Sequence, residues 1–329
     1  MEDITAYKLE FKTPLHLGQE GIGLEKTDMI IHSDTLFSAL LSCWNLFYAD
    51  DLEKEIINNP PFIISSAFPF SKDDYFLPRP MIRITLNQEV QSKQIKKIRF
   101  ISKGLFERII IGEEVLFTEE NTLQGGLFWT ETQDTSQGIF KKREVPRVSI
   151  DRRTNTSDIF YFNELVFTQG CGLFFLVKFL SPQIRQKFET VLNLMGDEGI
   201  GGDKHLGKGV FDVLKDEPFK LNTPSQANHF LTLSLFHPTE DEIKKGLLNN
   251  SSYELILRRG WLHSKGAMSL KRKSIRMFLE GSVFKEFGQK GYGNIPNVLE
   301  KNEELGTNHN VYRYGITFNI PIKVRDNYE

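Results

Sequence analysis

Hydrophobic and polar residues alternate near the start of the chain, where charged residues separate Tyr7, Leu9 and Phe11. A period of two predicts a half-buried strand. Over residues 36–47 the apolar side chains recur every three or four positions, which predicts a helix with one wide apolar face. Ser33 precedes that stretch and is expected to cap the helix.

A second ordered stretch begins at Leu173, where consecutive apolar residues predict a strand buried on both faces. Ser181 and Pro182 have the residue types of a helix start, and Gly196 is expected to end that helix. The glycine-rich segment Gly199 to Gly209 follows and leads directly into another strand. This segment is therefore expected to connect a helix to a strand.

The stretch between these two ordered regions contains short strand candidates around Ile63, Ile82, Phe100 and Ile110. Polar segments separate them, and we interpret the stretch as strands and insertions added to a first domain. Residues 88–137 are the least distinctive part, and no functional residue is predicted there.

The pattern restarts after residues 215–228, a proline-bearing segment that we interpret as a linker. Thr239 and Glu242 have the spacing of a capping box. Strand patterns cover residues 231–235, 255–261, 276–284 and 313–324. The order strand, helix, strand, strand thus occurs twice.

This repetition predicts an α+β fold with two ferredoxin-like (RRM-like, βαββαβ) domains. Residues 1–216 would form the first domain, with insertions and the glycine-rich segment. Residues 217–329 would form the second, which is degenerate because it lacks a clear second helix before its last strand.

Composition limits the classes of function. The chain has 329 residues and a net charge of -2, so a nucleic-acid site must be local. Two cysteines do not make a disulfide framework. No apolar run reaches the length of a membrane span, and the N-terminus has no secretory leader pattern. We therefore expect a cytoplasmic protein with no membrane contact.

The segment Gly199–Gly209 is the strongest candidate for a binding site in the sequence, because it contains five glycines and two lysines. Glycine permits positive φ angles, and consecutive backbone amides can then form an anion-binding nest. Lys204 and Lys208 add positive charge. A flexible turn is the plainer explanation, but five glycines exceed what a turn requires, so we favour phosphate binding.

Part of this segment nearly matches a nucleotide-binding P-loop. The magnesium-binding hydroxyl position is Gly209, however, and a P-loop runs from strand to helix. The dinucleotide fingerprint also fails, because its last glycine is replaced by Lys204. We therefore exclude NTP and NAD binding and expect no cofactor.

The helix start at Ser33 and Thr35 offers amides and hydroxyls that could hold a phosphate. From chemistry alone, an ordinary helix cap is the better interpretation. His16 and His32 are likewise more often structural than catalytic.

Two basic clusters suggest a local nucleic-acid track when they are considered together with the glycine-rich segment. Each cluster alone would be a solvated loop. The first contains Lys141, Lys142, Arg143, Arg147, Arg152 and Arg153, and the second contains Arg258, Arg259, Lys265, Lys271, Arg272, Lys273 and Arg276.

Catalytic motifs and metal-binding signatures are not found in the sequence. A metal-free ribonuclease needs an acid/base pair and phosphate stabilisation. His205 beside the lysines is the one plausible nucleus, and we consider a passive RNA contact the better interpretation.

Five segments resemble the RAMP proteins of type III CRISPR effectors, and most closely the fourth subunit of the type III-A (Csm) complex. They are Pro14–Gly18, Ile31–Leu40, Val145–Thr154, Gly199–Gly209 and Leu279–Phe284. The glycine-rich segment marks RAMP proteins generally, and the second and third segments narrow the match. A hairpin is expected to continue from the third segment through Thr154 to Ser157.

The resemblance implies a non-catalytic subunit that binds the repeat-derived 5′ handle of the CRISPR RNA (crRNA). It implies docking onto the large polymerase-like subunit and the backbone RAMP subunit, with target RNA met only indirectly. The resemblance, taken together with the charge and hydrogen-bonding capacity of the side chains, gives the candidate RNA-binding residues. They are His16, Gly18, Ser33, Thr35, Arg147, Arg152, Arg153, Gly199, Gly201, Gly202, Lys204, His205, Gly207, Lys208, Gly209, Lys271, Arg272 and Lys273.

Two alternatives stay open. One is a metal-independent endoribonuclease that processes precursor crRNA with His205 or His32. The other is a protein-only scaffold whose glycine-rich segment fits a partner. The classical RRM aromatic signature is not evident, so RNA contacts are expected from loops and domain edges.

Overall fold

A computed structural model of the chain describes residues 4–18, 26–49, 56–86, 92–131, 138–154, 156–216, 218–262, 270–289, 291–302 and 309–325. Its elements up to residue 216 are β1 (Ile4–Phe11), α1 (Ser33–Phe47), β2 (Phe62–Ile64), β3 (Phe68–Ser71), β4 (Asp74–Pro78), α2 (Ser92–Lys97), β5 (Phe100–Ser102), α3 (Lys103–Ile110), η3 (Glu119–Asn121), β6 (Thr122–Leu123), β7 (Phe128–Trp129), β8 (Phe140–Ile150), β9 (Ser157–Phe167), β10 (Cys171–Phe179), α4 (Ile184–Glu198), η4 (Lys204–Leu206) and β11 (Phe211–Asp216). The later ones are β12 (His229–Thr232), α5 (Glu240–Lys244), β13 (Leu255–Arg258), β14 (Trp261–Leu262), β15 (Leu270–Lys271), β16 (Ile275–Phe278), β17 (Val283–Lys285), β18 (Asn297–Leu299), β19 (Val311–Tyr312) and β20 (Asn319–Ile322).

A nine-stranded sheet organises the first part of the chain, in the order β11-β1-β10-β3-β4-β5-β7-β6, with β2 also paired to β10. β1 lies antiparallel between β10 and β11. Tyr7 and Leu9 of β1 are buried while Lys8 and Glu10 are half-buried, which confirms the predicted alternation. β10 is buried on both faces from Cys171 to Val177, also as predicted.

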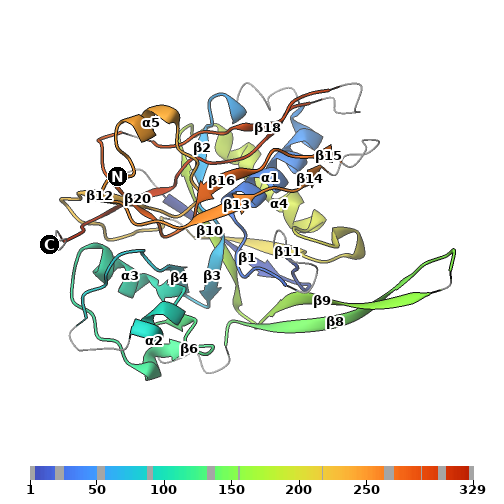
Figure 1. Cartoon of the computed structure of the whole chain (residues 1–329), viewed down its shortest axis with the longest axis horizontal. Coiled ribbons are helices and arrows are strands. Elements are labelled where there is room, and N and C mark those ends of the chain that lie inside the picture. Colours follow the sequence, from blue (N-terminus) through green and yellow to red (C-terminus); the bar gives the residue numbers. More distant parts are fainter. Residues whose placement is uncertain are drawn as a thin grey trace.

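Helices α1 and α4 pack against each other behind this sheet (Figure 1). Aromatic rings join the layers: Trp44 of α1 and Phe188 of α4 both contact Phe62 of β2. The predicted end of α4 at Gly196 is wrong, because that residue is helical. The helix runs to Glu198, and Gly199 with a φ of 75° ends it, since glycine adopts this backbone conformation without strain.

Ser33 does not cap α1. The cap position belongs to His32, and the Ser33 side chain is fully buried, where its hydroxyl accepts a hydrogen bond from the Leu235 amide at 3.0 Å. The predicted cap fails because this helix begins inside the protein, where partners far along the chain take the place of a local cap.

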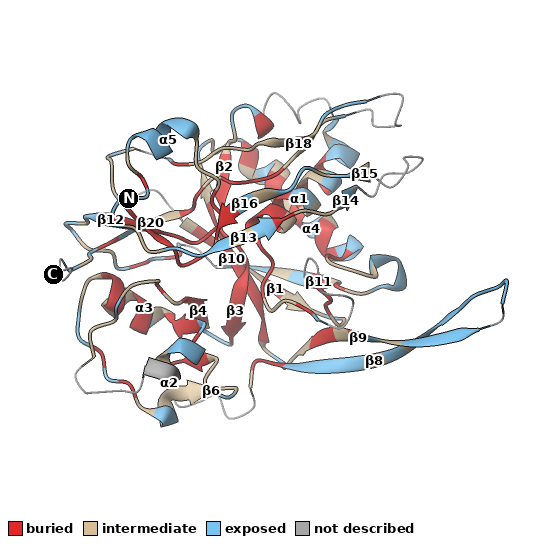
Figure 2. Cartoon of the chain, in the orientation of Figure 1, coloured by how far each residue is buried: buried red, intermediate tan, exposed pale blue. Residues whose placement is uncertain are grey.

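Strands β8 and β9 form a long antiparallel hairpin that projects from the body (Figure 1). The hairpin expected around Thr154 is thereby confirmed. Most of its outer half is exposed, in contrast to the buried centre of the main sheet (Figure 2). Exposed apolar side chains, including Val148 and Ile159, lie directly opposite each other on it.

The second part of the chain builds a three-stranded sheet, β17-β12-β20, and several two-stranded ribbons. The capping box of Thr239 and Glu242 is present at the start of α5. Leu231 and Tyr314 from this part belong to the same hydrophobic core as the nine-stranded sheet. The segment after β11, interpreted as a linker, is packed: Phe219 is buried and its ring lies edge-on to Tyr75.

Candidate nucleic-acid interface

The glycine-rich segment folds back on the residues that follow β1. The amide of Gly209 donates to the Pro14 carbonyl at 3.0 Å, and the amide of Gly202 donates to the His16 carbonyl at 2.9 Å. Within the segment, the Ile200 amide donates to the Gly209 carbonyl at 3.0 Å. The loop is therefore held by backbone hydrogen bonds at both of its ends.

This close packing explains most of the glycines. A Cβ on Gly209 would lie 1.9 Å from the Ile200 carbonyl oxygen, and one on Gly201 would lie 2.3 Å from that of His16. A Cβ on Gly199 would lie 2.5 Å from the Lys208 carbonyl oxygen. Only at Gly207 is there open space around the glycine. The glycine content therefore reflects packing first, and it does not by itself indicate a ligand.

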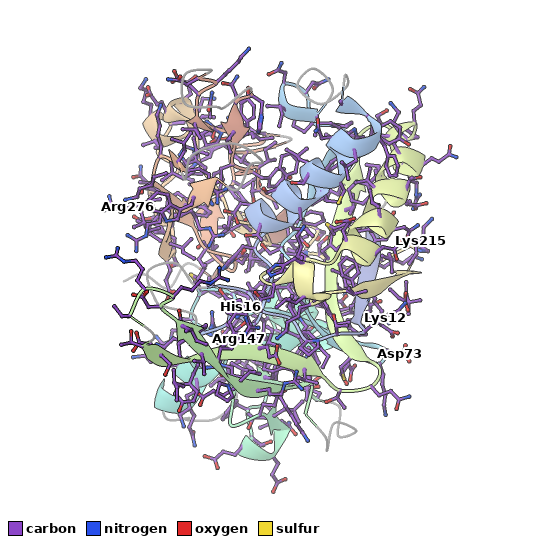
Figure 3. All side chains as sticks on the ribbon, turned by 90° about the vertical axis from the view of Figure 1, so that its right-hand side faces the viewer. Lys12, His16, Asp73, Arg147, Lys215 and Arg276 are labelled. Carbon is purple, nitrogen blue, oxygen red and sulfur yellow. The ribbon has the colours of Figure 1, made fainter. Side chains whose placement is uncertain are left out.

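The middle of the β8–β9 hairpin is joined to this loop through Phe162. The ring of His16 lies 4.0 Å from that ring, and the Arg147 guanidinium lies 4.1 Å above it. Lys208 also lies over Phe162, at 5.1 Å. Figure 3 shows His16 and Arg147 close together beside the hairpin.

Two ion pairs complete this junction. Lys208 is paired with the fully buried Glu164 of β9, which Arg143 also contacts at 2.5 Å. Arg147 is paired with Asp203 of the loop at 2.5 Å. Lys208 and Arg147 thus have structural partners, whereas Lys204 is exposed and forms no ion pair within the described part of the chain.

The start of α1 is tied to the second part of the chain by buried charges. Asp34, whose side chain is 1% exposed, accepts two hydrogen bonds from Arg258 at 2.9 Å and one from Arg313. His32 lies between Glu280 at 2.9 Å and Asp28 at 3.3 Å. We call Asp34, Arg258 and Arg313 with His32 and Glu280 the buried clamp.

The neighbours of His32 and Asp34 determine whether these two side chains are charged. Burial alone lowers the pKa of His32, but the charge of Glu280 and the hydrogen bonds with Asp28 and Glu280 outweigh it and raise the pKa to about 10. Burial raises the pKa of Asp34, but Arg258 and Arg313 outweigh it and hold that pKa well below its usual range. Both groups are therefore charged near neutral pH.

The raised pKa of His32 predicts a pH-dependent stability. Its contribution is fully present below the ordinary value of 6.5, where the unfolded chain also holds the proton, and is lost as the pH rises toward about 10. The urea midpoint should fall over that range, and less steeply in a His32→Gln variant. A wild-type midpoint that stays constant across the range would contradict the clamp.

A cleft of about 460 Å³ opens beside the clamp. One wall is the exposed side of α1, another is the glycine-rich loop, and the third comes from the second part of the chain. Its charged or polar lining includes Asp28, His32, Asp34, Thr35, Ser38, Ser42, Lys204, Arg258, Arg272 and Arg313. Positive side chains outnumber the two carboxylates, so the cleft suits an anionic ligand.

Apart from Arg147, Lys208, Gly199 and Gly209, whose packing is described above, the predicted site residues fall into three groups, with Lys204 in two of them. Exposed residues are Lys204, His205, Gly207, Arg152, Arg153, Lys271 and Lys273. Lys204, Thr35, Arg272, Gly18, Gly201 and Gly202 line the cleft. His16 and Ser33, both candidate RNA contacts, are buried: the glycine-rich loop packs against His16, and Ser33 lies inside the protein at the start of α1.

Sequence reasoning missed the roles of Asp34 and Arg313. Asp34 lies in the first turn of α1, where a carboxylate also suits the helix dipole, and Arg313 was assigned only to a strand pattern. Arg258 was noted within a basic cluster but not as part of a site. Asp34 stands between Ser33 and Thr35, as acidic residues at an exposed helix start do, so nothing in the sequence indicates that it is buried and therefore needs a charged partner.

Comparison with known proteins identifies the family. The RAMP superfamily profile matches residues 8–212, and the CRISPR Csm4 C-terminal domain profile matches residues 225–322. The chain therefore belongs to the RAMP superfamily. Within it, the likeness is to Csm4, and the predicted resemblance to the fourth Csm subunit is confirmed.

Two relatives illustrate the extent of the match. Csm4 of Thermococcus onnurineus (strain NA1) is 27% identical over 317 residues, which is 91% of this chain and 94% of that protein. Csm4 of Methanocaldococcus jannaschii is 23% identical over an alignment of 377 positions, which covers 98% of this chain and 98% of that protein.

Solved structures share the fold. The Csm3–Csm4 subcomplex of the type III-A CRISPR-Cas interference complex matches with a TM-score of 0.65 and 18% identity, covering 98% of this chain and 100% of that one. The Csm1–Csm4 cassette in complex with cA4 matches with a TM-score of 0.61 and 20% identity, covering 99% and 100%. In the described part of this chain, no helix is long and apolar enough to cross a membrane.

Proposed function

We propose that this chain is a non-catalytic crRNA-binding subunit of a type III-A CRISPR interference complex. It recognises the repeat-derived 5′ handle and docks the large polymerase-like subunit onto the backbone RAMP subunit. Solved structures in which Csm4 is held with Csm1 or with Csm3 support these partners.

One observation carries the RNA-binding part of this proposal: the cationic cleft between α1, the glycine-rich loop and Arg258, Arg272 and Arg313. The whole chain has a net charge of only -2, so a positive cleft marks a local site for a phosphate backbone. Exposed Lys204 stands at its edge on the loop, and Lys271 and Lys273 flank Arg272 in the sequence.

The domain organisation belongs to the same proposal. We assign residues 1–216 and 217–329 to two ferredoxin-like domains. In the first domain, the antiparallel strand order β11-β1-β10-β3 supports this assignment. Helix α1 follows β1 in the sequence and α4 follows β10, as the two helices of a ferredoxin-like domain do. In the second, β17-β12-β20 with α5 supports a reduced version of the same plan.

Reversing the charge of Lys204 tests RNA binding without disturbing the fold. In Lys204→Glu, affinity for repeat-handle RNA should fall about tenfold at low salt. The slope of log K against log salt should also flatten by about 0.7 for each phosphate that the protein no longer neutralises. Fluorescence anisotropy over a salt series measures both. Lys208→Glu would be a poorer test, because it breaks the buried pair with Glu164.

Lys244→Glu is the matched control, since Lys244 is an exposed lysine on α5 that does not line the cleft. Equal RNA affinity of wild type and Lys204→Glu would count against the proposal and favour a protein-only scaffold. Shortened RNA after incubation with the wild type, abolished in His205→Ala, would favour the endoribonuclease alternative. His32 lines the cleft, but Glu280 and Asp28 outweigh its burial, raise its pKa to about 10 and keep the imidazole protonated near neutral pH, which counts against its acting as a general base.

A further inference from the structure

The cleft has two chemically different walls. On α1, Thr35, Ser38 and Ser42 lie about one helical turn apart, and all three line the cleft. Ala39 lies between them, so this wall carries only short side chains. Hydroxyl groups both donate and accept hydrogen bonds, which suits the mixed edge of a base or a ribose.

The opposite wall is made of guanidinium groups. Arg258, Arg272 and Arg313 line it, and Lys204 adds an ammonium group from the loop. Guanidinium groups pair with phosphate oxygens through two parallel hydrogen bonds, and their planes can stack on a base. Arg258 and Arg313 already bond Asp34 through their guanidinium groups, so this wall offers a phosphate positive charge and offers a base guanidinium planes on which to stack.

Arg313 is the most deeply buried of the three arginines of this wall. Arg313 is 5% exposed, and its Nε has no hydrogen-bond partner among the described residues. Its two terminal nitrogens are already bonded, one to Asp34 and one to the Arg259 carbonyl at 3.3 Å. This Nε is itself enclosed by the protein, so Arg313 contributes positive charge to the wall, and a ligand in the cleft does not bond that atom.

The arginines are held in place before any ligand arrives. Asp34 binds both Arg258 and Arg313, and the Thr35 hydroxyl accepts a further hydrogen bond from Arg258 at 3.0 Å. Side chains fixed in this way lose little conformational entropy on binding. The buried clamp is thus also the support for the cationic wall of the cleft.

The volume of the cleft shows how much of an RNA strand it can hold. Sites for small ligands enclose about 300–1,000 Å³, and this cleft of about 460 Å³ lies at the small end of that range. Buried apolar residues, Leu17, Ile30 and Ile31, close part of it. It is too small for a helical duplex, but it has room for one base with its sugar and phosphate.

We infer that the cleft receives one nucleotide turned out of the bound RNA strand. Its phosphate lies against the arginines and Lys204, and its base and ribose edges lie against the hydroxyls of α1. This inference rests on the proposed function, because the RNA must first be held. A free mononucleotide has the same chemistry, and the test separates the two sources.

An abasic scan of the handle RNA tests the inference. Each nucleotide is replaced in turn by an abasic unit, and the affinity of the purified full-length chain is measured. In the wild type, one position should lose about tenfold in affinity, the order expected when one base is removed from its site. The Ser38→Phe variant fills the cleft from an exposed position, so it should fold normally and lose this position-specific penalty. Asn45→Phe, also exposed on α1 but outside the cleft, should keep it.

The outcomes separate this inference from the proposed function. Tight RNA binding with an equal penalty at every abasic position would overturn the inference and leave the proposed function intact. If the wild type bound no handle RNA at all, the proposed function itself would fail. AMP and UMP serve as competitors: a free nucleotide that binds in a Ser38-dependent way without competing with RNA would also overturn the inference.

Discussion

Replacing Asp34 with alanine is expected to lower the free energy of unfolding by about 3–5 kcal/mol, because it leaves two buried arginines without their shared counterion. Arg258 and Arg313 are at most 9% exposed, so water cannot take the place of the carboxylate. Urea unfolding followed by the fluorescence of the three tryptophans measures the change.

Asp73→Ala is the matched control for this prediction. Asp73 is fully exposed, lies 3.9 Å from Lys8 and is labelled in Figure 3. A single surface ion pair contributes little, so its loss should leave the unfolding free energy nearly unchanged. If Asp34→Ala were as harmless as Asp73→Ala, the clamp would not hold the two parts of the chain together.

Substituting alanine for Gly209 should cost about 2–5 kcal/mol and distort the glycine-rich loop. The residue has a φ of 71°, and a Cβ would meet the Ile200 carbonyl oxygen at 1.9 Å. Backbone atoms cannot yield as a side chain can, so the hydrogen bond from Gly209 to Pro14 should break and Lys204 should move. RNA affinity should fall together with the urea midpoint.

Gly207→Ala isolates the effect of that close approach. Gly207 has a similar φ of 74° but open space around it, so only the backbone strain of about 1–2 kcal/mol should remain. Comparable losses in both variants would show that backbone strain alone accounts for the need for glycine in this loop. A much larger loss at Gly209 would establish the close approach as the cause.

Local patterns predicted the elements whose residues interact with near neighbours. The alternation of β1, the continuous apolar run of β10 and the capping box of α5 were all found as expected. The α+β class followed from them. At Ile110, however, a strand was expected and helix α3 was found. The buried residues Leu105, Phe106, Ile109 and Ile110 recur with helical spacing, a signal that the isolated isoleucines concealed.

The site could be predicted only in part, because its decisive interactions join distant residues. Asp34 and Arg258 lie 224 positions apart, and no pattern within a window of the sequence reveals such a pair. The glycine-rich loop was recognised, but the sequence did not reveal that its glycines pack against the backbone of the loop itself and against His16. Lys208 and Arg147 looked like surface cations and instead bind Glu164 and Asp203.

The hairpin of β8 and β9 has a mechanical consequence. Eleven paired residues in each strand, at about 3.4 Å per residue, make a ribbon roughly 35 Å long, and the contacts with the glycine-rich loop described above reach along it as far as Arg147. A load applied at Arg152 or Arg153 near the tip therefore acts on the part of the ribbon that extends beyond Arg147. The resisting torque falls on the two ion pairs and the Phe162 stack at the glycine-rich loop, so bending the ribbon and shifting that loop are one motion.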